Sequence, residues 1–165
     1  MMGRIILNLL EMLRLRSGPQ QMPAGWLLTA GLSFAYIYQG FVAERIVGDS
    51  DSGPRSLVAI GVQFGVIALL LNLRNFQARL AQTLSALAGT GLIFGLVSLL
   101  ILTRIDPGKP QPDLALMYLI LFGWSLAVDA HIYRQALSIK FGQGLLMAVL
   151  IFAANFVLLK TLFGT

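Results

Sequence analysis

The residues with the greatest capacity for chemistry lie in the stretch G-W-S-L-A-V-D-A-H-I-Y-R-Q at 123–135, which contains Asp129 and His131. A carboxylate and an imidazole so close in the chain could exchange a proton. On a helix, however, residues two apart project about 200° from one another around the axis, so these two side chains face different ways. Ser125, Asp129 and Tyr133 recur at helical spacing and share one face. We therefore expect no local proton relay between Asp129 and His131.

The depth of Asp129 in a spanning helix decides whether its carboxylate has a functional role. A charge at the centre of a bilayer costs about 2.5–3.5 kcal/mol on insertion scales and marks a candidate functional site. Asp129 lies four residues before Tyr133, and Tyr133 suits the inner membrane boundary. That spacing corresponds to about 6 Å of helix. We therefore expect Asp129 at the inner interface, in a structural ion pair, with a transport site as the alternative. Its candidate partners are Arg74, Arg79 and Arg134.

Two amides, Gln63 and Asn155, lie near the middle of apolar stretches. An amide in lipid needs partners for both its donor and its acceptor atoms. Such hydrogen bonds hold neighbouring helices together with about 0.6–2 kcal/mol each, but the same groups could line a path for a solute. The candidate polar site within the membrane therefore consists of Gln63, Asp129 and Asn155.

Pairs of glycines four residues apart occur in two successive apolar stretches, as Gly61-x-x-x-Gly65 and Gly91-x-x-x-Gly95. Small residues at this spacing let two helix backbones approach closely in lipid. The two helices are joined by a short loop, so we expect them to pack together as a hairpin through these glycines. The alternative is a seam for a partner protein or a second copy of the chain.

Motifs for enzymatic chemistry are missing from the sequence. The chain has no cysteine and one histidine, which excludes thiolate sites and a haem held by two histidines of this chain. It has no H-E-x-x-H, no G-x-S-x-G and no phosphate-binding glycine loop. We therefore expect no enzyme, no cofactor and no metal site. The net charge of +5 is spread between apolar stretches, which favours lipid headgroups over nucleic acid as partners.

The elements that must position these side chains are apolar helices. Of 165 residues, 57% are hydrophobic and 12% are charged, whereas soluble domains have about 45–50% and about 25%. A stretch of about 20 apolar residues can span a bilayer as a helix. The sequence therefore predicts an all-α integral membrane protein with a five-helix transmembrane domain at 19–165. The approximate bounds of the spans are 25–43, 56–73, 80–102, 114–133 and 141–163.

Residues 1–18 form a separate predicted unit, an amphipathic helix in the headgroup region. Polar residues recur at helical spacing among apolar ones, which is typical of a helix that sinks one face into lipid. The S-G-P sequence at 17–19 then interrupts the helix. The polar positions are Arg4, Asn8, Glu11 and Arg14.

The distribution of basic residues predicts the orientation of the chain, since cytoplasmic loops carry an excess of Lys and Arg. Seven basic residues lie on the side of the N-terminus: Arg4, Arg14, Arg16, Arg74, Arg79, Arg134 and Lys140. Five lie on the other side: Arg45, Arg55, Arg104, Lys109 and Lys160. We therefore expect a bacterial inner-membrane protein with its N-terminus in the cytoplasm and its C-terminus outside, in the periplasm.

Five closely spaced spans between Gly25 and Phe163, preceded by R-S-G-P-Q-Q-M-P-A-G-W, resemble the plan of the Yip family and of small bacterial inner-membrane proteins. The resemblance implies membrane organisation or the binding of partners, and it carries no catalytic chemistry.

Two functions agree with these observations. The favoured one is an accessory, assembly or scaffold subunit that binds the lipid bilayer and other integral membrane proteins, or itself as an oligomer. The alternative is a protomer of an oligomeric transporter or channel for ions or small solutes. We expect oligomerisation in that case, because five short helices enclose little volume. A cavity that reaches Gln63 or Asn155 would favour the alternative.

Overall fold

The computed structural model describes residues 2–47, 52–106 and 108–164, which form α-helices and two short 3-10 helices and contain no strand. Five of the helices are long and apolar enough to cross a membrane. The prediction of an all-helical chain with five helices of spanning length is therefore confirmed, and the five apolar helices suggest an integral membrane protein. The elements are α1 (Met2–Leu13), η1 (Pro19–Gln21), α2 (Trp26–Val47), α3 (Ser52–Leu73), η2 (Gln77–Arg79), α4 (Leu80–Leu102), α5 (Pro112–Leu137) and α6 (Phe141–Phe163).

Three helices extend beyond the bounds that hydropathy predicts. Helix α2 continues four residues past 43, to Val47. Helix α5 continues through Arg134 to Leu137 and ends where Ser138 adopts a left-handed conformation with φ of 55°. Helix α3 begins at Ser52 instead of residue 56. Hydropathy detects the apolar part of a helix, whereas its backbone hydrogen bonds continue into the polar residues at its ends.

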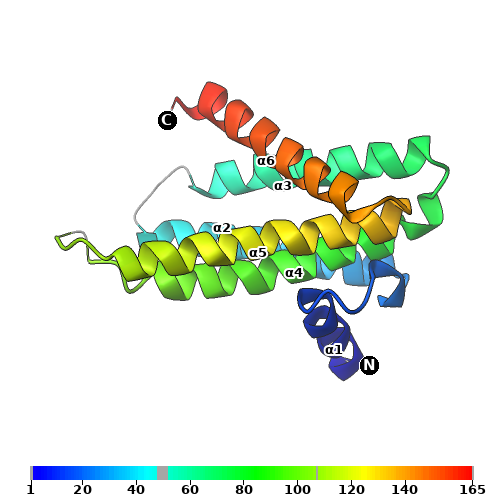
Figure 1. Cartoon of the computed structure of the whole chain (residues 1–165), viewed down its shortest axis with the longest axis horizontal. Helices are drawn as coiled ribbons and strands as arrows, with labels where there is room; N and C mark the ends of the chain where they lie inside the picture. Colours follow the sequence, from blue (N-terminus) through cyan, green and yellow to red (C-terminus); the bar gives the residue numbers. More distant parts are fainter. Residues whose placement is uncertain (1, 48–51, 107, 165) are drawn as a thin grey trace.

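The five long helices form a ring (Figure 1). Helix α2 packs between α3 and α4, α4 packs against α5, α5 against α6, and α6 closes the ring against α3. Helix α6 starts beside α5 and leans away from it toward α3 as it approaches its C-terminal end. The order around the ring therefore differs from the order in the chain, because α2 separates α3 from α4.

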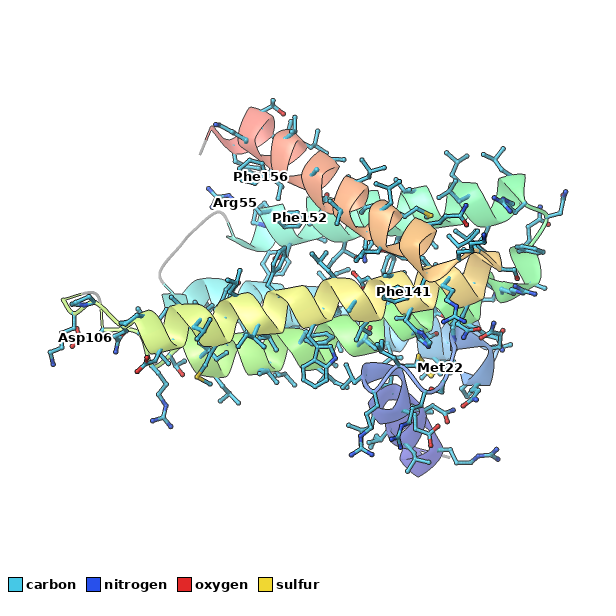
Figure 2. The ribbon with its side chains drawn as sticks, viewed as in Figure 1. Met22, Arg55, Asp106, Phe141, Phe152 and Phe156 are labelled. Carbon is cyan, nitrogen blue, oxygen red and sulfur yellow. The ribbon has the colours of Figure 1, made fainter. Side chains whose placement is uncertain are left out.

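The two ends of the ring differ in packing. Met22 and Asp106 lie near opposite ends of the bundle (Figure 2). At the Met22 end, α1 and η1 fold against α4 and α5, and the interior is filled with side chains. The largest completely buried side chains lie in this half and in α1, and they include Met12, Met22, Ile67, Leu71, Val128, Ile132 and Tyr133.

Helix α1 crosses the outside of α4 and α5. Leu9 packs so closely on Gly89 of α4 that a Cβ atom built at Gly89 would lie 2.6 Å from Leu9 Cδ2. Trp124 of α5 donates a hydrogen bond from Nε1 to the Leu13 carbonyl at 2.9 Å. The apolar residues of α1 that do not pack on the bundle remain exposed, namely Ile6, Leu7 and Leu10.

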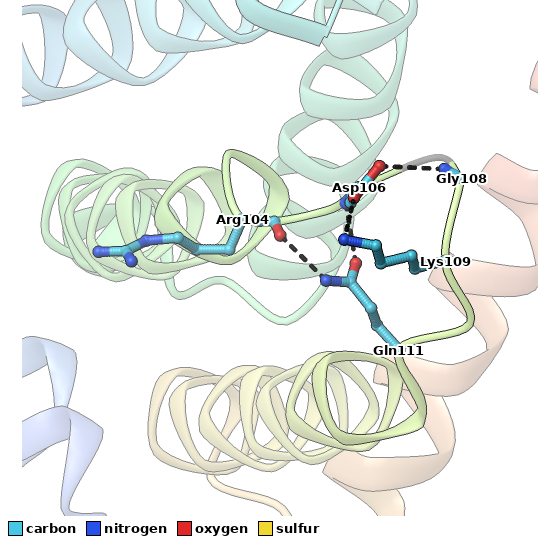
Figure 3. A network of polar contacts seen from close by, with 5 residues as sticks. All are labelled: Arg104, Asp106, Gly108, Lys109 and Gln111. Carbon is cyan, nitrogen blue, oxygen red and sulfur yellow. Dashed lines mark hydrogen bonds and ion pairs between the residues drawn. The ribbon is translucent and has the colours of Figure 1, made fainter.

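The loop between α4 and α5 lies at the opposite end and is held by local polar contacts (Figure 3). Asp106 pairs with Lys109 at 3.4 Å and accepts a hydrogen bond from the Gly108 amide at 3.1 Å. Gln111 accepts a hydrogen bond from the Asp106 amide at 2.8 Å. These contacts give the loop a defined shape beside the less densely packed half of the ring.

Candidate functional site

A polar cluster joins α3 and α5 in the middle of the bundle. The Nε2 of Gln63 donates hydrogen bonds to Asp129 Oδ2 at 3.1 Å and to Tyr133 Oη at 2.8 Å. Gln63 lies halfway along α3, which runs from Ser52 to Leu73. Asp129 lies eight residues before the end of α5, or about 12 Å of helix. Asp129 thus lies about one helical turn further from the end of α5 than the predicted span places it, and its expected place at the inner membrane interface stays a prediction.

The expected ion pair of Asp129 with an arginine is absent among the described residues. Arg79 instead donates from Nη1 to the Ala136 carbonyl at 3.0 Å and to Ser138 Oγ at 3.0 Å. A cation there satisfies carbonyl groups that the end of α5 leaves free. Arg74 and Arg134 are exposed. The expected pair is wrong for two reasons. Arg134 lies five residues after Asp129 and therefore projects about 140° away around the helix, and Arg79 binds at the end of α5, about 12 Å of helix beyond Asp129.

His131 has a separate structural role. Its buried ring places Nε2 3.0 Å from the Ser17 carbonyl. A carbonyl oxygen only accepts hydrogen bonds, so this nitrogen carries the proton. His131 thus fixes the segment that follows α1, while Asp129 and Tyr133 point to Gln63 on another face of α5. This division agrees with the helical spacing and gives no proton relay between Asp129 and His131.

Adjoining half-open cavities lie between the helices of the ring, beside the Gln63 cluster. One of about 200 Å³ is lined by Gln63, Ser125 and Asp129 together with Tyr36 of α2. A second, of about 280 Å³, shares these four residues and extends to Asn155 of α6. The interior of a single chain therefore contains polar space at the level of Gln63 and Asn155.

A third cavity of about 350 Å³ continues from Tyr36 toward the end of the ring opposite α1. Its lining includes Gln39, Ser98 and, nearer that end, Ala43 and Ser56. The cavities thus occupy the middle and one half of the ring. The other half holds the buried side chains described above, and a separate cavity of about 390 Å³ lies there against the turn between α3 and α4, lined by Ala68, Leu71 and Leu80 among others.

Gln39 is a buried amide in the third cavity. Its side chain is 8% exposed, and neither Nε2 nor Oε1 has a hydrogen-bond partner. A buried polar group without a partner costs about 1–3 kcal/mol. Gln39 therefore offers both a donor and an acceptor to a polar molecule in the cavity.

Asn155 provides a second incompletely satisfied amide. Its Nδ2 donates to the Ala59 carbonyl at 3.4 Å, while its buried Oδ1 has no partner. The structure thus brings all three residues of the predicted polar site, Gln63, Asp129 and Asn155, to the lining of one cavity.

The glycines of α4 make room for this lining. A Cβ atom built at Gly91 would lie 2.7 Å from Cζ of Tyr36, and one built at Gly95 would lie 2.6 Å from Nε2 of Gln39. Gly61 and Gly65 are exposed, and built Cβ atoms there meet nothing within 4 Å. The expected hairpin contact between the two glycine pairs is therefore wrong, because Gly91 and Gly95 face α2.

Tyr36 and Gln39 were not among the site residues predicted from the sequence. Tyr36 and Gln39 lie three apart and so share one face of α2, and Gly91 and Gly95 lie four apart and share one face of α4. This spacing is a signal that could have suggested contact between α2 and α4. All five spans are apolar around most of their circumference, so hydropathy did not reveal it.

No protein-family model, curated protein or solved structure matches the chain. The resemblance to the Yip family stays a prediction. Across residues 2–47, 52–106 and 108–164, no group of three His, Cys, Asp or Glu side chains is placed to hold a metal ion. The site consists of a carboxylate, amides, hydroxyl groups and aromatic rings inside a ring of apolar helices.

Proposed function

We propose that this chain is an integral membrane protein that binds a small polar solute inside its helix ring and acts as a transporter protomer. The observation that carries the proposal is the cavity lined by Gln63, Asp129 and Asn155 within five apolar helices. Ionisable and amide groups in membrane proteins face the interior or a water-filled space, and they mark solute paths. Because the cavity lies within one chain, the binding step needs no oligomer.

The asymmetry of the ring supports a carrier rather than a continuous pore. The adjoining cavities extend from Tyr133 to Ala43 and Ser56. Buried side chains such as Ile67, Val128 and Ile132 occupy the half near α1, and the cavity at the turn between α3 and α4 shares no lining residue with the series. A carrier alternates between states that open to one side and then to the other. The arrangement is that of a state open toward the loop between α4 and α5.

The membrane placement is part of the same proposal. Lys and Arg are more numerous on the side of α1, which favours a cytoplasmic N-terminus in a bacterial inner membrane. The exposed Ile6, Leu7 and Leu10 of α1 suit a helix that lies at the lipid boundary. On this orientation the cavity opens to the periplasm.

Cysteine accessibility tests the proposal, since the chain has no cysteine of its own and every introduced thiol is unique. Ser98→Cys and Asn155→Cys should react in membrane vesicles with a small charged methanethiosulfonate. The reagent needs a thiolate, which forms in water and not in hydrocarbon. The matched controls are Leu100→Cys and Val157→Cys, two residues along the same helices and 67% and 60% exposed on the outer surface of the ring.

The expected result is modification of both cavity positions and of neither control, from the side of the α4–α5 loop alone. Equal protection of all four thiols would contradict a water-accessible cavity. Equal reaction from both sides would contradict the one-sided state and favour a pore.

An accessory or scaffold subunit is the second candidate function, and Gly61 and Gly65 favour it. They are exposed on α3 with open space above them, and such a pair lets a second helix approach closely. Purification at native expression level in mild detergent should recover a partner or a second copy. Gly61→Leu with Gly65→Leu should abolish this recovery, whereas Gly31→Leu, at another open glycine, should not. A wild-type chain that always emerges alone would contradict this candidate.

A further inference from the structure

The charge of the cavity lining indicates the kind of solute that it can hold. The described residues that line the three cavities include one carboxylate, Asp129, and no Lys, Arg or His. A partly buried carboxylate without a cationic partner is unfavourable, because burial removes part of its hydration. A cationic solute would supply the missing partner.

Gln63 occupies one oxygen of the Asp129 carboxylate and leaves the other for a cationic solute. Gln63 donates to Oδ2 of Asp129, and no described residue donates a hydrogen bond to Oδ1. The same Nε2 also donates to Tyr133, so Gln63 presents its donor side to the cluster. Because Asp129 lines the cavity of about 200 Å³, its second oxygen is free to face the charge of a bound cation.

Aromatic rings line the same cavity. Tyr36, Phe94, Tyr118 and Phe122 come from three helices and surround the space beside Asp129. The face of an aromatic ring attracts an organic cation when the charge lies within about 6 Å of the ring centroid. A metal cation instead needs several oxygen ligands, and Gln63 offers a nitrogen donor here. The lining thus favours an organic cation over a metal ion.

From these observations we propose that the cavity beside Asp129 binds a small organic ammonium ion, with its charge between that carboxylate and the aromatic rings. The inference rests on the proposed function and specifies its solute class. Ligand pockets commonly measure about 300–1,000 Å³, so a cavity of about 200 Å³ suits a small molecule. The unpartnered amide of Gln39 in the adjoining cavity is available to a hydroxyl group on the same ligand.

The test is thermal unfolding of the purified full-length chain in mild detergent with added choline. Ligand that binds the folded state raises the unfolding temperature in a concentration-dependent way. Two additives serve as controls: dimethylbutanol, the neutral carbon isostere of choline, and sodium chloride at equal ionic strength. We expect stabilisation by choline alone.

Matched variants locate the effect. Asp129→Asn keeps an acceptor for Gln63 but removes the charge, and it should weaken choline binding about tenfold or more. Asp106→Asn removes an exposed carboxylate from the α4–α5 loop and should leave binding unchanged. Tyr36→Leu should weaken binding roughly twofold to thirtyfold through the lost ring, whereas Tyr36→Phe should retain it.

Three outcomes would overturn the ammonium inference while leaving the cavity proposal to the cysteine experiment. The first is equal stabilisation by dimethylbutanol and choline. The second is stabilisation by sodium that Asp129→Asn abolishes. The third is the absence of stabilisation by choline although the Ser98→Cys and Asn155→Cys variants react with the thiol reagent. If Asp129→Asn fails to fold, unchanged choline binding in Tyr36→Leu would also overturn it. Protection of the introduced thiols would instead overturn the proposed function.

Discussion

The amide nitrogen of Gln63 lies 3.1 Å from Oδ2 of Asp129 and links the middle of α3 to the C-terminal half of α5. Helices α3 and α5 are not neighbours in the ring. Helix α6 lies between them on one side, and α2 and α4 lie between them on the other. The hydrogen bond therefore crosses the interior of the ring, and both of its residues line the cavities. The same amide holds Tyr133, which is fully buried. One side chain thus determines the position of the only carboxylate in the described lining.

Gln63→Leu should destabilise the folded chain by about 1–3 kcal/mol, because Asp129 and the fully buried Tyr133 both lose their hydrogen-bond donor. The measurement is the free energy of unfolding in mixed micelles. A double-mutant cycle with Tyr133→Phe should show a coupling energy of about 0.5–3 kcal/mol, since the two side chains share a hydrogen bond. Gln77→Leu, at an exposed residue of η2, is the control and should change stability little. Additive effects of Gln63→Leu and Tyr133→Phe would contradict the shared bond.

More of the fold than of the candidate site could be predicted from the sequence. Apolar runs of spanning length, separated by short polar segments, identify five helices because a bilayer requires that length. The order of helices around the ring could not be predicted, since helices apolar on every side do not reveal which face meets which neighbour. Gly91 and Gly95 show the difficulty. Their spacing predicts close packing, but the partner is α2, through Tyr36 and Gln39, and not α3.

The residues of the site could be named, but their contacts could not be predicted. Gln63, Asp129 and Asn155 stand out as polar side chains in apolar stretches, and the structure brings them to one cavity. Asp129 was expected to pair with an arginine at the inner membrane interface because Tyr133 resembles an interfacial aromatic residue. In the structure Tyr133 is completely buried as a partner of Gln63. A tyrosine at a membrane boundary and one in a polar core have the same local sequence pattern, so only tertiary contacts distinguish them.

Gly144→Ala should destabilise the chain by about 1–3 kcal/mol, because a Cβ atom at this position would collide with the backbone carbonyl oxygen of Ala130 on α5. Backbone cannot move aside as a flexible side chain can, so α5 and α6 would have to separate. Gly142→Ala, two residues earlier in α6, is the matched control. A Cβ atom there meets nothing within 4 Å, and alanine favours a helix over glycine by about 0.5–1 kcal/mol. Unfolding of both variants in the same micelles should show opposite signs. Equal effects would contradict the close crossing of α5 and α6.

Arg79→Ala should destabilise the chain by about 1–2 kcal/mol, because its guanidinium satisfies the Ala136 carbonyl and Ser138 Oγ at the end of α5. The guanidinium also lies 4.4 Å from the ring centroid of Phe76, and this contact would be lost as well. Arg74→Ala removes the same charge from an exposed position nearby and should have little effect. Unfolding in micelles at low and high salt separates the two contributions, since a screened surface charge loses its effect in salt. A loss in Arg74→Ala equal to that in Arg79→Ala would show that charge alone matters.

Asn75→Cys and Lys109→Cys should be labelled from opposite sides of the membrane. Asn75 is exposed in the turn between α3 and α4, and Lys109 is exposed in the loop between α4 and α5, so helix α4 separates them. The excess of Lys and Arg on the side of Asn75 predicts that this turn faces the cytoplasm. An impermeant maleimide should therefore label Lys109→Cys in intact spheroplasts and Asn75→Cys only in inverted vesicles, with detergent-solubilised protein as the control for reactivity. The reverse pattern would place the open end of the cavity in the cytoplasm. Solute capture would then start from the inside, and the direction of transport would be export.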